Sequence, residues 1–261
     1  GVFRNGEHIF VRVTSVDGAT GIAACKPSRI RDILPIMLNR VIPSLIGEDA
    51  RDIEYRVDKV YLAQSNYKWQ GLPFWVATAY VEIAVLDLLG RVAARPIGEL
   101  LGGRVRDQVA IYFASGNRGN SPQEEGAYLQ SLIDRSGAKA VKCRLGARMH
   151  YTDASTRRDM ALISAARREL GEDVTIYADA NGSYDVPMAI RIGHMLEENN
   201  VAFFEEPCPF DHYEETRAVA DALESPIAGG EEESSMRQMM WLMDHDVHQV
   251  IQPDLLYFGG L

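Results

Sequence analysis

Four acidic residues stand at regular intervals in the later part of the chain, each just after a short apolar segment. They are Asp179 in Ala-Asp-Ala-Asn, Glu205 in Phe-Glu-Glu-Pro, Glu231 after a glycine pair, and Asp254 in Gln-Pro-Asp. Successive members are 26, 26 and 23 residues apart, which is the length of one strand and one helix. In a parallel sheet this spacing returns all four carboxylates to the edge formed by the C-terminal ends of the strands, where α/β proteins place their sites.

Carboxylate oxygens gathered at one edge are the ligands that hard divalent cations prefer in proteins. Two positions leave a choice of ligand. Glu205 and Glu206 are adjacent, so strand alternation points them to opposite faces and only one can face the site. Glu231 is followed by Glu232 and Glu233. We favour Glu231 there, because it directly follows the predicted strand and the glycine pair.

Two basic residues stand at the end of an earlier predicted strand. Lys142 and Arg144 flank Cys143, and residues two apart on a strand point to the same face. By the same rule Asn181 shares a face with Asp179. An edge that holds several carboxylates, a divalent cation and two basic side chains suits a substrate that is itself anionic and rich in oxygen.

The elements that would position these residues alternate regularly from residue 107 onward. Short apolar segments alternate with amphipathic helical segments, which predicts a parallel sheet with right-handed crossovers, either open or closed into a barrel. One predicted helix begins Ser-Pro-Gln-Glu, in which Ser121 caps the helix and Glu124 completes a capping box. The six predicted strands cover residues 109–113, 140–144, 175–179, 202–205, 226–228 and 249–252.

The first 106 residues predict a separate α+β unit. Asp17 and Gly18 form a turn between two alternating segments, which is typical of a hairpin. A helix then follows the predicted cap Ser28 and is kinked at Pro35. The most apolar stretch, 74–89, contains two carboxylates and is too short to span a membrane, so we predict a buried helix. The predicted elements are strands 9–13 and 22–25 and helices 30–41, 51–63 and 73–90.

The amino-acid composition indicates which kinds of molecule the protein binds and in which cellular compartment it works. The chain has 27 basic and 37 acidic residues, for a formal net charge of −10. This charge repels phosphate backbones and anionic lipid headgroups, which argues against nucleic acid or a membrane as the main partner. The three cysteines lie far apart and form no CxxC pair, which indicates reduced thiols in a cytoplasmic protein.

Taken together, these motifs resemble the mandelate racemase and muconate lactonizing enzyme subgroup of the enolase superfamily. The resemblance extends over nearly the whole chain and implies a capping domain at residues 1–106 and a modified TIM (β/α) barrel at 107–261. A barrel has eight strands and six are predicted, so we expect two more strand and helix units beyond Leu261. The matching segments are AVKCR at 140–144, ADANG at 178–182, FEEP at 204–207, GGE at 229–231, QPD at 252–254, and 84–103 upstream.

The resemblance implies the chemistry of the site. Enzymes of this subgroup abstract the proton α to a carboxylate and pass through an enediolate, whose charge must be stabilised by metal and cations. The resemblance assigns Mg2+ to Asp179, Glu205 and Glu231. Lys142 would add positive charge opposite the metal. Asp254 would orient a general-base histidine on the next strand, beyond Leu261.

Two neighbours of the metal ligands and one departure from the family pattern refine this interpretation. Asn181 would bind substrate or a metal-bound water, and Glu206 would contact the metal ligands without binding the metal itself. The commonest family pattern is Lys-x-Lys, whereas Arg144 stands in the second position here. Arginine stays protonated at any useful pH, so it is a poor base, and a two-base racemase is disfavoured.

We therefore expect dehydration of a sugar acid to a 2-keto-3-deoxy acid, with Lys142 and Arg144 stabilising charge and Asp254 serving the base. The alternatives are a racemase, epimerase or cycloisomerase acting on a carboxylate substrate, and a catalytically inactive metal-binding homologue. The expected partners are a small carboxylate and further copies of the chain. His245 and His248 precede the sixth predicted strand, so we interpret them as structural rather than as metal ligands.

Overall fold

The computed structural model describes residues 1–261, except for the side chains of Ile53 and Glu54. The chain folds into two compact units. The sheet unit comprises Gln108–Gly230 and Met239–Gln252. The capping unit comprises Gly1–Asp107 together with two later segments, Glu231–Gln238 and Pro253–Leu261.

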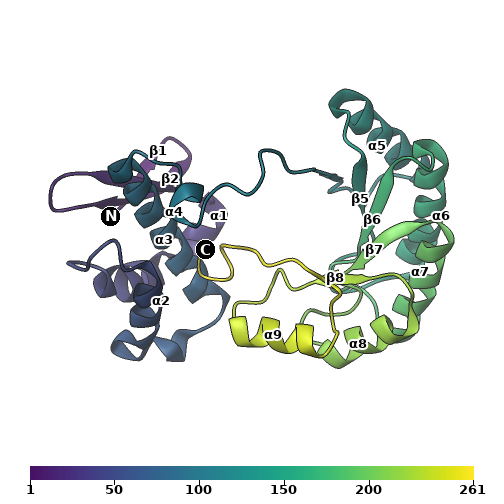
Figure 1. Cartoon of the computed structure of the whole chain (residues 1–261). Helices are drawn as coiled ribbons and strands as arrows, with labels where there is room; N and C mark the ends of the chain where they lie inside the picture. The colour runs from purple at the N-terminus through teal and green to yellow at the C-terminus, as the bar shows by residue number, and fades with distance from the viewer. The chain divides into compact units, whose positions relative to one another are not determined.

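The sheet unit is built on six parallel strands in chain order, β4 to β9. The register pairs Arg144 with Asp179 and Asp179 with Glu205, so the ends of three neighbouring strands lie side by side. Helices α5 to α8 run along one face of these strands (Figure 1). This is the predicted alternation of a (β/α) barrel. The strands are β4 Phe113–Ala114, β5 Ala140–Arg144, β6 Thr175–Asp179, β7 Val201–Glu205, β8 Ile227–Gly229 and β9 Val250–Ile251.

Three of the helices that follow these strands, α5 to α7, begin at side-chain caps. At the start of α5, the backbone N–H of Glu124 donates to Ser121 Oγ and the backbone N–H of Ser121 donates to Glu124 Oε2, which confirms the predicted capping box. Thr152 forms the equivalent pair at α6, and Asp185 caps α7. The helices are α5 Pro122–Ser136, α6 Asp153–Leu170, α7 Val186–Glu198, α8 Tyr213–Ala222 and α9 Met236–Asp244.

The capping unit packs an antiparallel sheet, in the order β1-β2-β3, against the long helix α3. Gly21 lets β3 approach α3 closely, because a Cβ there would lie 2.2 Å from the carbonyl oxygen of Ala84. Asp87 fixes the same contact by accepting a hydrogen bond from the backbone N–H of Ile22 at 2.8 Å. The elements are β1 Val2–Asn5, β2 His8–Thr14, β3 Thr20–Cys25, α1 Pro27–Ile36, α2 Ile53–Leu62, α3 Leu72–Ala93 and α4 Ile97–Leu100.

Helix α3 is long and apolar enough to cross a membrane by length and composition alone. It is nevertheless the core helix of the capping unit, because 67% of its most apolar window is buried inside the protein. Phe74, Tyr80 and Leu86 are each at most 1% exposed. The prediction of a buried helix in this stretch is confirmed.

The structure differs from the predicted elements at several places. β1 was not predicted; it pairs with β2. The predicted strand 109–113 is reduced to Phe113–Ala114, because pairing with β5 begins only at Phe113. Helix α1 begins after Lys26 rather than at Ser28, since Pro27 takes its first position. Pro35 lacks a backbone N–H, and beyond it the helix widens to a π-helical turn at Met37–Val41.

Candidate functional site

The sheet unit brings four of the predicted site residues to the C-terminal ends of three adjacent strands. Lys142 and Arg144 lie on β5, and Asp179 and Glu205 are the last residues of β6 and β7. Lys142, Asp179 and Glu205 are at most 5% exposed. Charged groups this deeply buried are stable only when they are paired, so their contacts define the site.

Lys142 is the centre of a network of opposite charges. Its Nζ donates to both oxygens of Glu205, at 2.7 and 2.6 Å, and lies 3.3 Å from Oδ2 of Asp179. The guanidinium of Arg144 contacts the same oxygen of Asp179. Gln252 on the far side donates to Glu205 at 3.2 Å. Two carboxylates and two cations therefore balance within a site that is largely shielded from water.

Asn181 and Glu206 form the rim of this network. Both residues turn the chain sharply after their strands, with φ angles of 46° and 48°, a region that asparagine tolerates better than most residues. The backbone N–H of Asn181 donates to Oδ1 of Asp179 at 2.8 Å, and its Nδ2 donates to Glu206 at 3.0 Å. Asn181 thus holds Asp179 in place and joins Glu206 to the site. The predicted roles of Asn181 toward substrate and Glu206 toward the metal ligands stay predictions.

The carboxylates of the network are suited to a hard cation. Oδ2 of Asp179 is fully buried and accepts no hydrogen bond, although the ammonium of Lys142 and the guanidinium of Arg144 lie against it. Carboxylate oxygens are the donor type that Mg2+ requires. Across the described residues, no group of three or more His, Cys, Asp or Glu side chains is arranged to hold one metal ion. Asp179 and Glu205 supply carboxylates from two neighbouring strands.

The predicted third ligand, Glu231, and the predicted base partner, Asp254, belong to the capping unit. There they contribute to the electrostatic surroundings of Tyr257, whose pKa is raised mainly by burial. Burial and the carboxylate of Glu231 also raise the pKa of Glu232. Arg29 stacks on Tyr257, 4.4 Å from the ring centroid, and supplies the positive charge in this acidic group. The roles of Glu231 and Asp254 toward metal and base stay predictions.

Sequence patterns did not reveal the residues that hold the loop after β4. Arg158 of α6 donates to the backbone carbonyls of Asn117 and Asn120, at 3.4 and 2.9 Å, on either side of Arg118. Asn120 also donates to the buried Glu125 at 2.7 Å. Arg118 in turn donates to Asn181 at 2.6 Å. Arg118 and the two asparagines occupy an irregular segment without periodicity, and the only signal in the sequence is the concentration of asparagine and arginine at 117–120.

The histidines that could suggest a second metal centre are engaged in packing. The ring of His245 stacks on Trp241 with centroids 4.1 Å apart, and its Nδ1 lies 2.8 Å from the carbonyl oxygen of that residue. The ring of His248 lies against Gly229, where a Cβ would approach it to 2.7 Å. Burial lowers the pKa of His248 to about 4, so this imidazole is neutral at physiological pH. The structural roles of His245 and His248 stay predictions.

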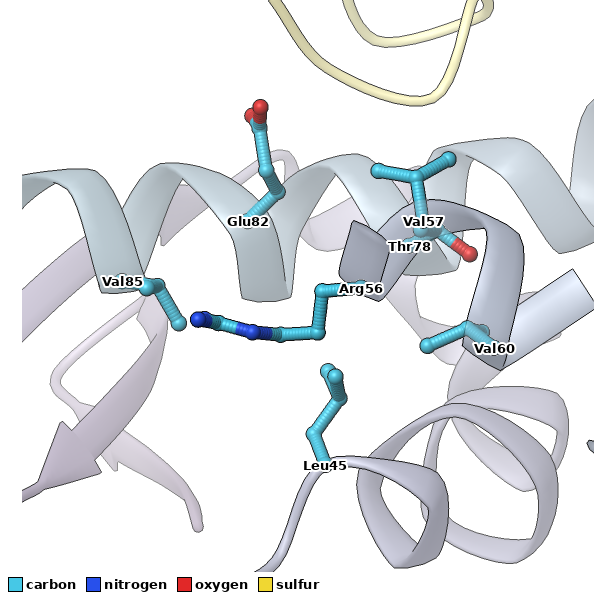
Figure 2. Close-up of a pocket in the computed structure, with 7 residues that line it drawn as sticks. All are labelled: Leu45, Arg56, Val57, Val60, Thr78, Glu82 and Val85. Atoms are coloured by element: carbon cyan, nitrogen blue, oxygen red, sulfur yellow. The ribbon is translucent and has the colours of Figure 1, made fainter. Parts of the chain in front are cut away.

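A small cavity of about 20 Å3 is lined by residues of the capping unit. That volume holds about one water molecule, so the cavity is too small for a sugar acid. Figure 2 shows Arg56 extended along it, while the carboxylate of Glu82 points away from the guanidinium. The lining residues are Leu45, Arg56, Val57, Val60, Thr78, Glu82 and Val85.

Two family descriptions match the chain. Residues 2–102 match the mandelate racemase / muconate lactonizing enzyme N-terminal domain, and residues 125–261 match the enolase C-terminal domain-like family. Among solved structures, a mandelate racemase/muconate lactonizing protein from Paracoccus denitrificans, complexed with magnesium, is 30% identical with a TM-score of 0.88. That comparison covers 97% of this chain and 68% of the other.

Two curated relatives are named as sugar-acid dehydratases. The arabinonate dehydratase of Saccharolobus solfataricus is 29% identical over 261 residues, which cover 98% of this chain and 67% of the relative. The L-talarate/galactarate dehydratase of Salmonella typhimurium is 28% identical over 221 residues, which cover 85% of this chain and 54% of the relative. The chain thus spans between about half and two thirds of the length of these proteins.

Proposed function

The chain belongs to the mandelate racemase / muconate lactonizing enzyme family, and on this premise we propose that it is a Mg2+-dependent dehydratase of sugar acids. The reaction removes the proton α to a carboxylate and the hydroxyl group β to it as water, leaving a 2-keto-3-deoxy acid. The observation that carries the proposal is the buried network of Lys142, Arg144, Asp179 and Glu205 at the ends of adjacent parallel strands. The dehydratase names of two relatives support the reaction class.

The residues of the network have distinct roles in this proposal. Asp179 and Glu205, with Glu231 as third ligand, would hold Mg2+. The chemistry that the bound metal supplies is neutralisation of charge on the substrate's carboxylate oxygens. Lys142 stabilises the same oxygens as the α proton leaves, since its ammonium is held without freedom to reorient. Asp254 orients the base that takes the proton.

Arg144 distinguishes dehydration from two-base racemisation. A guanidinium stays protonated throughout the working pH range and cannot accept the α proton. It can bind an anionic substrate group while it contacts Asp179. We therefore assign Arg144 to charge stabilisation. Arg144→Ala should lower turnover by at least about tenfold, and unchanged turnover would show that this assignment is wrong.

A screen of sugar acids tests the function directly. The intact protein is incubated with Mg2+ and a library of aldonates and aldarates, and keto-acid formation is followed. Each candidate is also incubated in D2O. A dehydratase yields a keto acid, whereas a racemase or epimerase returns deuterium-labelled substrate or its epimer. A protein that binds Mg2+ but does neither would support the inactive homologue instead.

The proposal extends to partners and location. The substrate is a small carboxylate, and copies of the same chain are the expected protein partners. Cys25, Cys143 and Cys208 are all free and buried, in keeping with a cytoplasmic protein. Size-exclusion chromatography with light scattering tests the expected homo-oligomer.

A further inference from the structure

The loop after β4 presents a cation that the proposed reaction does not yet use. Arg118 lies between Asn117 and Asn120, whose carbonyl oxygens both accept hydrogen bonds from Arg158. Its own Nε donates to the carbonyl oxygen of Leu145 at 3.1 Å, just beyond β5. A side chain anchored through its Nε, in a loop whose neighbouring carbonyl groups are also held, loses less conformational freedom when a ligand binds.

The guanidinium of Arg118 meets that of Arg144 at one acceptor. Nη2 of Arg118 lies 2.6 Å from Oδ1 of Asn181, and Nη1 of Arg144 lies 3.2 Å from the same oxygen. A neutral amide oxygen is a weak partner for two like charges. Arg144 has Asp179 as its counter-ion, so the unbalanced positive charge at this acceptor is that of Arg118, and a bound anion would neutralise it.

Charge pairing differs between the two arginines. Arg144 is paired with Asp179, whereas Arg118 forms no ion pair with any carboxylate in the described part of the chain. The hydrogen bonds from its Nε and Nη2 use only part of the five donors that a guanidinium carries. Burial, followed by the charges of Arg144 and Arg148, lowers the pKa of Arg118 to about 10. Arg118 thus remains charged at physiological pH, and the neighbouring charges of Arg144, Arg148 and Arg158 outnumber the one carboxylate that acts on it, Asp159, which favours a bound anion.

We propose that Arg118 is a substrate-binding residue, which together with Arg144 and the amide of Asn181 binds a carboxylate of the acid. The side chains of Arg118, Arg144 and Asn181 are all partly exposed, so a solute can reach them. This inference rests on the proposed function, because it takes the network at the ends of β5 to β7 as the place where the acid binds.

The test measures binding as well as turnover, in the intact protein with Mg2+. Arg118→Gln removes the charge, and Arg118→Lys keeps the charge but loses the planar fork. Arg148→Gln is the matched control, since Arg148 is exposed at the same end of the sheet and acts on Arg118 only through its charge. Calorimetry with tartrate, a hydroxylated dicarboxylate, gives a dissociation constant that does not depend on turnover.

We expect Arg118→Gln to weaken tartrate binding and raise KM for the sugar acid by at least about tenfold, with kcat changed by less than about threefold. Arg118→Lys should lie between this variant and the wild type, and Arg148→Gln should stay within about threefold of the wild type. Circular dichroism and Tm measurements check that each variant is folded. If Arg118→Gln does not fold, the comparison is made with Arg118→Lys.

Three results would overturn the inference: no tartrate binding by the wild type, equal losses in the Arg118 and Arg148 variants, or a fall in kcat with KM and tartrate affinity unchanged. The last pattern would show that Arg118 only positions Asn181 and Arg144. If tartrate binding follows the expected order but no sugar acid is dehydrated, the inference stands and the proposed reaction fails.

Discussion

The two units of the chain bury charged side chains in opposite ways. In the sheet unit, Lys142 bridges Glu205 and Asp179 through its ammonium group. In the capping unit, Arg56 and Glu82 line the same small cavity, yet no ion pair joins them within the described part of the chain. Figure 2 shows the carboxylate of Glu82 turned away from the guanidinium.

In the capping unit, the charged groups of Arg56 and Glu82 form hydrogen bonds with the backbone instead of with each other. Arg56 donates to the carbonyl oxygen of Asp49, and Glu82 accepts hydrogen bonds from the backbone N–H of Leu261 at 3.2 and 3.3 Å. Burial raises the pKa of Glu82 to about 7 and lowers the pKa of Arg56. A shifted pKa in a cavity therefore does not by itself mark the reactive site here. Paired charges at aligned strand ends indicate the site better.

The largest effect should follow from removing the central cation of the sheet unit. Lys142→Met leaves Asp179 and Glu205 buried without their ammonium partner, which should cost about 3 to 5 kcal/mol of unfolding free energy in Mg2+-free buffer. Turnover should fall by about a thousandfold or more. Urea denaturation and a keto-acid assay measure the two effects.

Lys139→Met is the matched control for this variant. Lys139 is exposed and directly precedes the same strand, so its loss should change stability by less than about 0.5 kcal/mol. Saturating Mg2+ should return part of the stability lost in Lys142→Met, because a bound cation restores positive charge between the carboxylates. Equal stability of the two variants without metal would mean that the network contributes nothing to folding.

A smaller, pH-dependent effect should come from the capping unit. Since the pKa of Glu82 is raised from 4.5 to about 7, the folded state keeps a proton that the unfolded chain has lost. The stabilisation is complete below about pH 4.5 and is lost as the pH rises through 7. Glu82→Gln should therefore gain about 3 kcal/mol relative to the wild type between pH 4.5 and 8.5, measured by urea denaturation.

The exposed Glu7 of the same unit provides the control, and Glu7→Gln should show no such trend with pH. A Glu82→Gln difference that stays constant from pH 4.5 to 8.5 would contradict the claim that this carboxylate is buried without a cation. The two units would then no longer differ in how they hold charge.

The smallest change in stability should follow from removing an uncharged group of the sheet unit, the hydroxyl of Ser121. Ser121→Ala removes the oxygen that accepts from Glu124 at the start of α5 and should cost about 1 kcal/mol. Ser131→Ala in the same helix should cost less, because the Ser131 hydroxyl bonds only to the carbonyl oxygen of Tyr128. If Ser121→Ala proved as costly as Lys142→Met, the pairing of charges would not be what distinguishes the site.

The sequence predicted most of the sheet unit because its strands and helices are periodic. Strand alternation placed Lys142 and Arg144 on one face, and the regular spacing placed Asp179 and Glu205 at neighbouring strand ends. The family motifs then supplied roles that geometry alone could not. These predictions rest on local patterns that tertiary packing preserves.

The remaining features depend on contacts between segments that have no period. Arg118 is positioned by Arg158, which lies on a helix 40 residues later, and by Asn181 after a different strand. The hydrophobic pattern likewise does not predict that two later segments, Glu231–Gln238 and Pro253–Leu261, belong to the capping unit. Such long-range polar contacts require coordinates, because hydrogen bonds between loops constrain residue type only weakly.

The central claim is that the charged network at the ends of β5, β6 and β7 is the metal-dependent reaction site. Titration of the intact protein with Mg2+ by calorimetry tests it most directly. We expect one ion per chain, with affinity lowered by about a hundredfold or more in Asp179→Asn and in Glu205→Gln, and nearly unchanged in Asp254→Asn. Wild-type affinity in the Asp179 and Glu205 variants would contradict the claim.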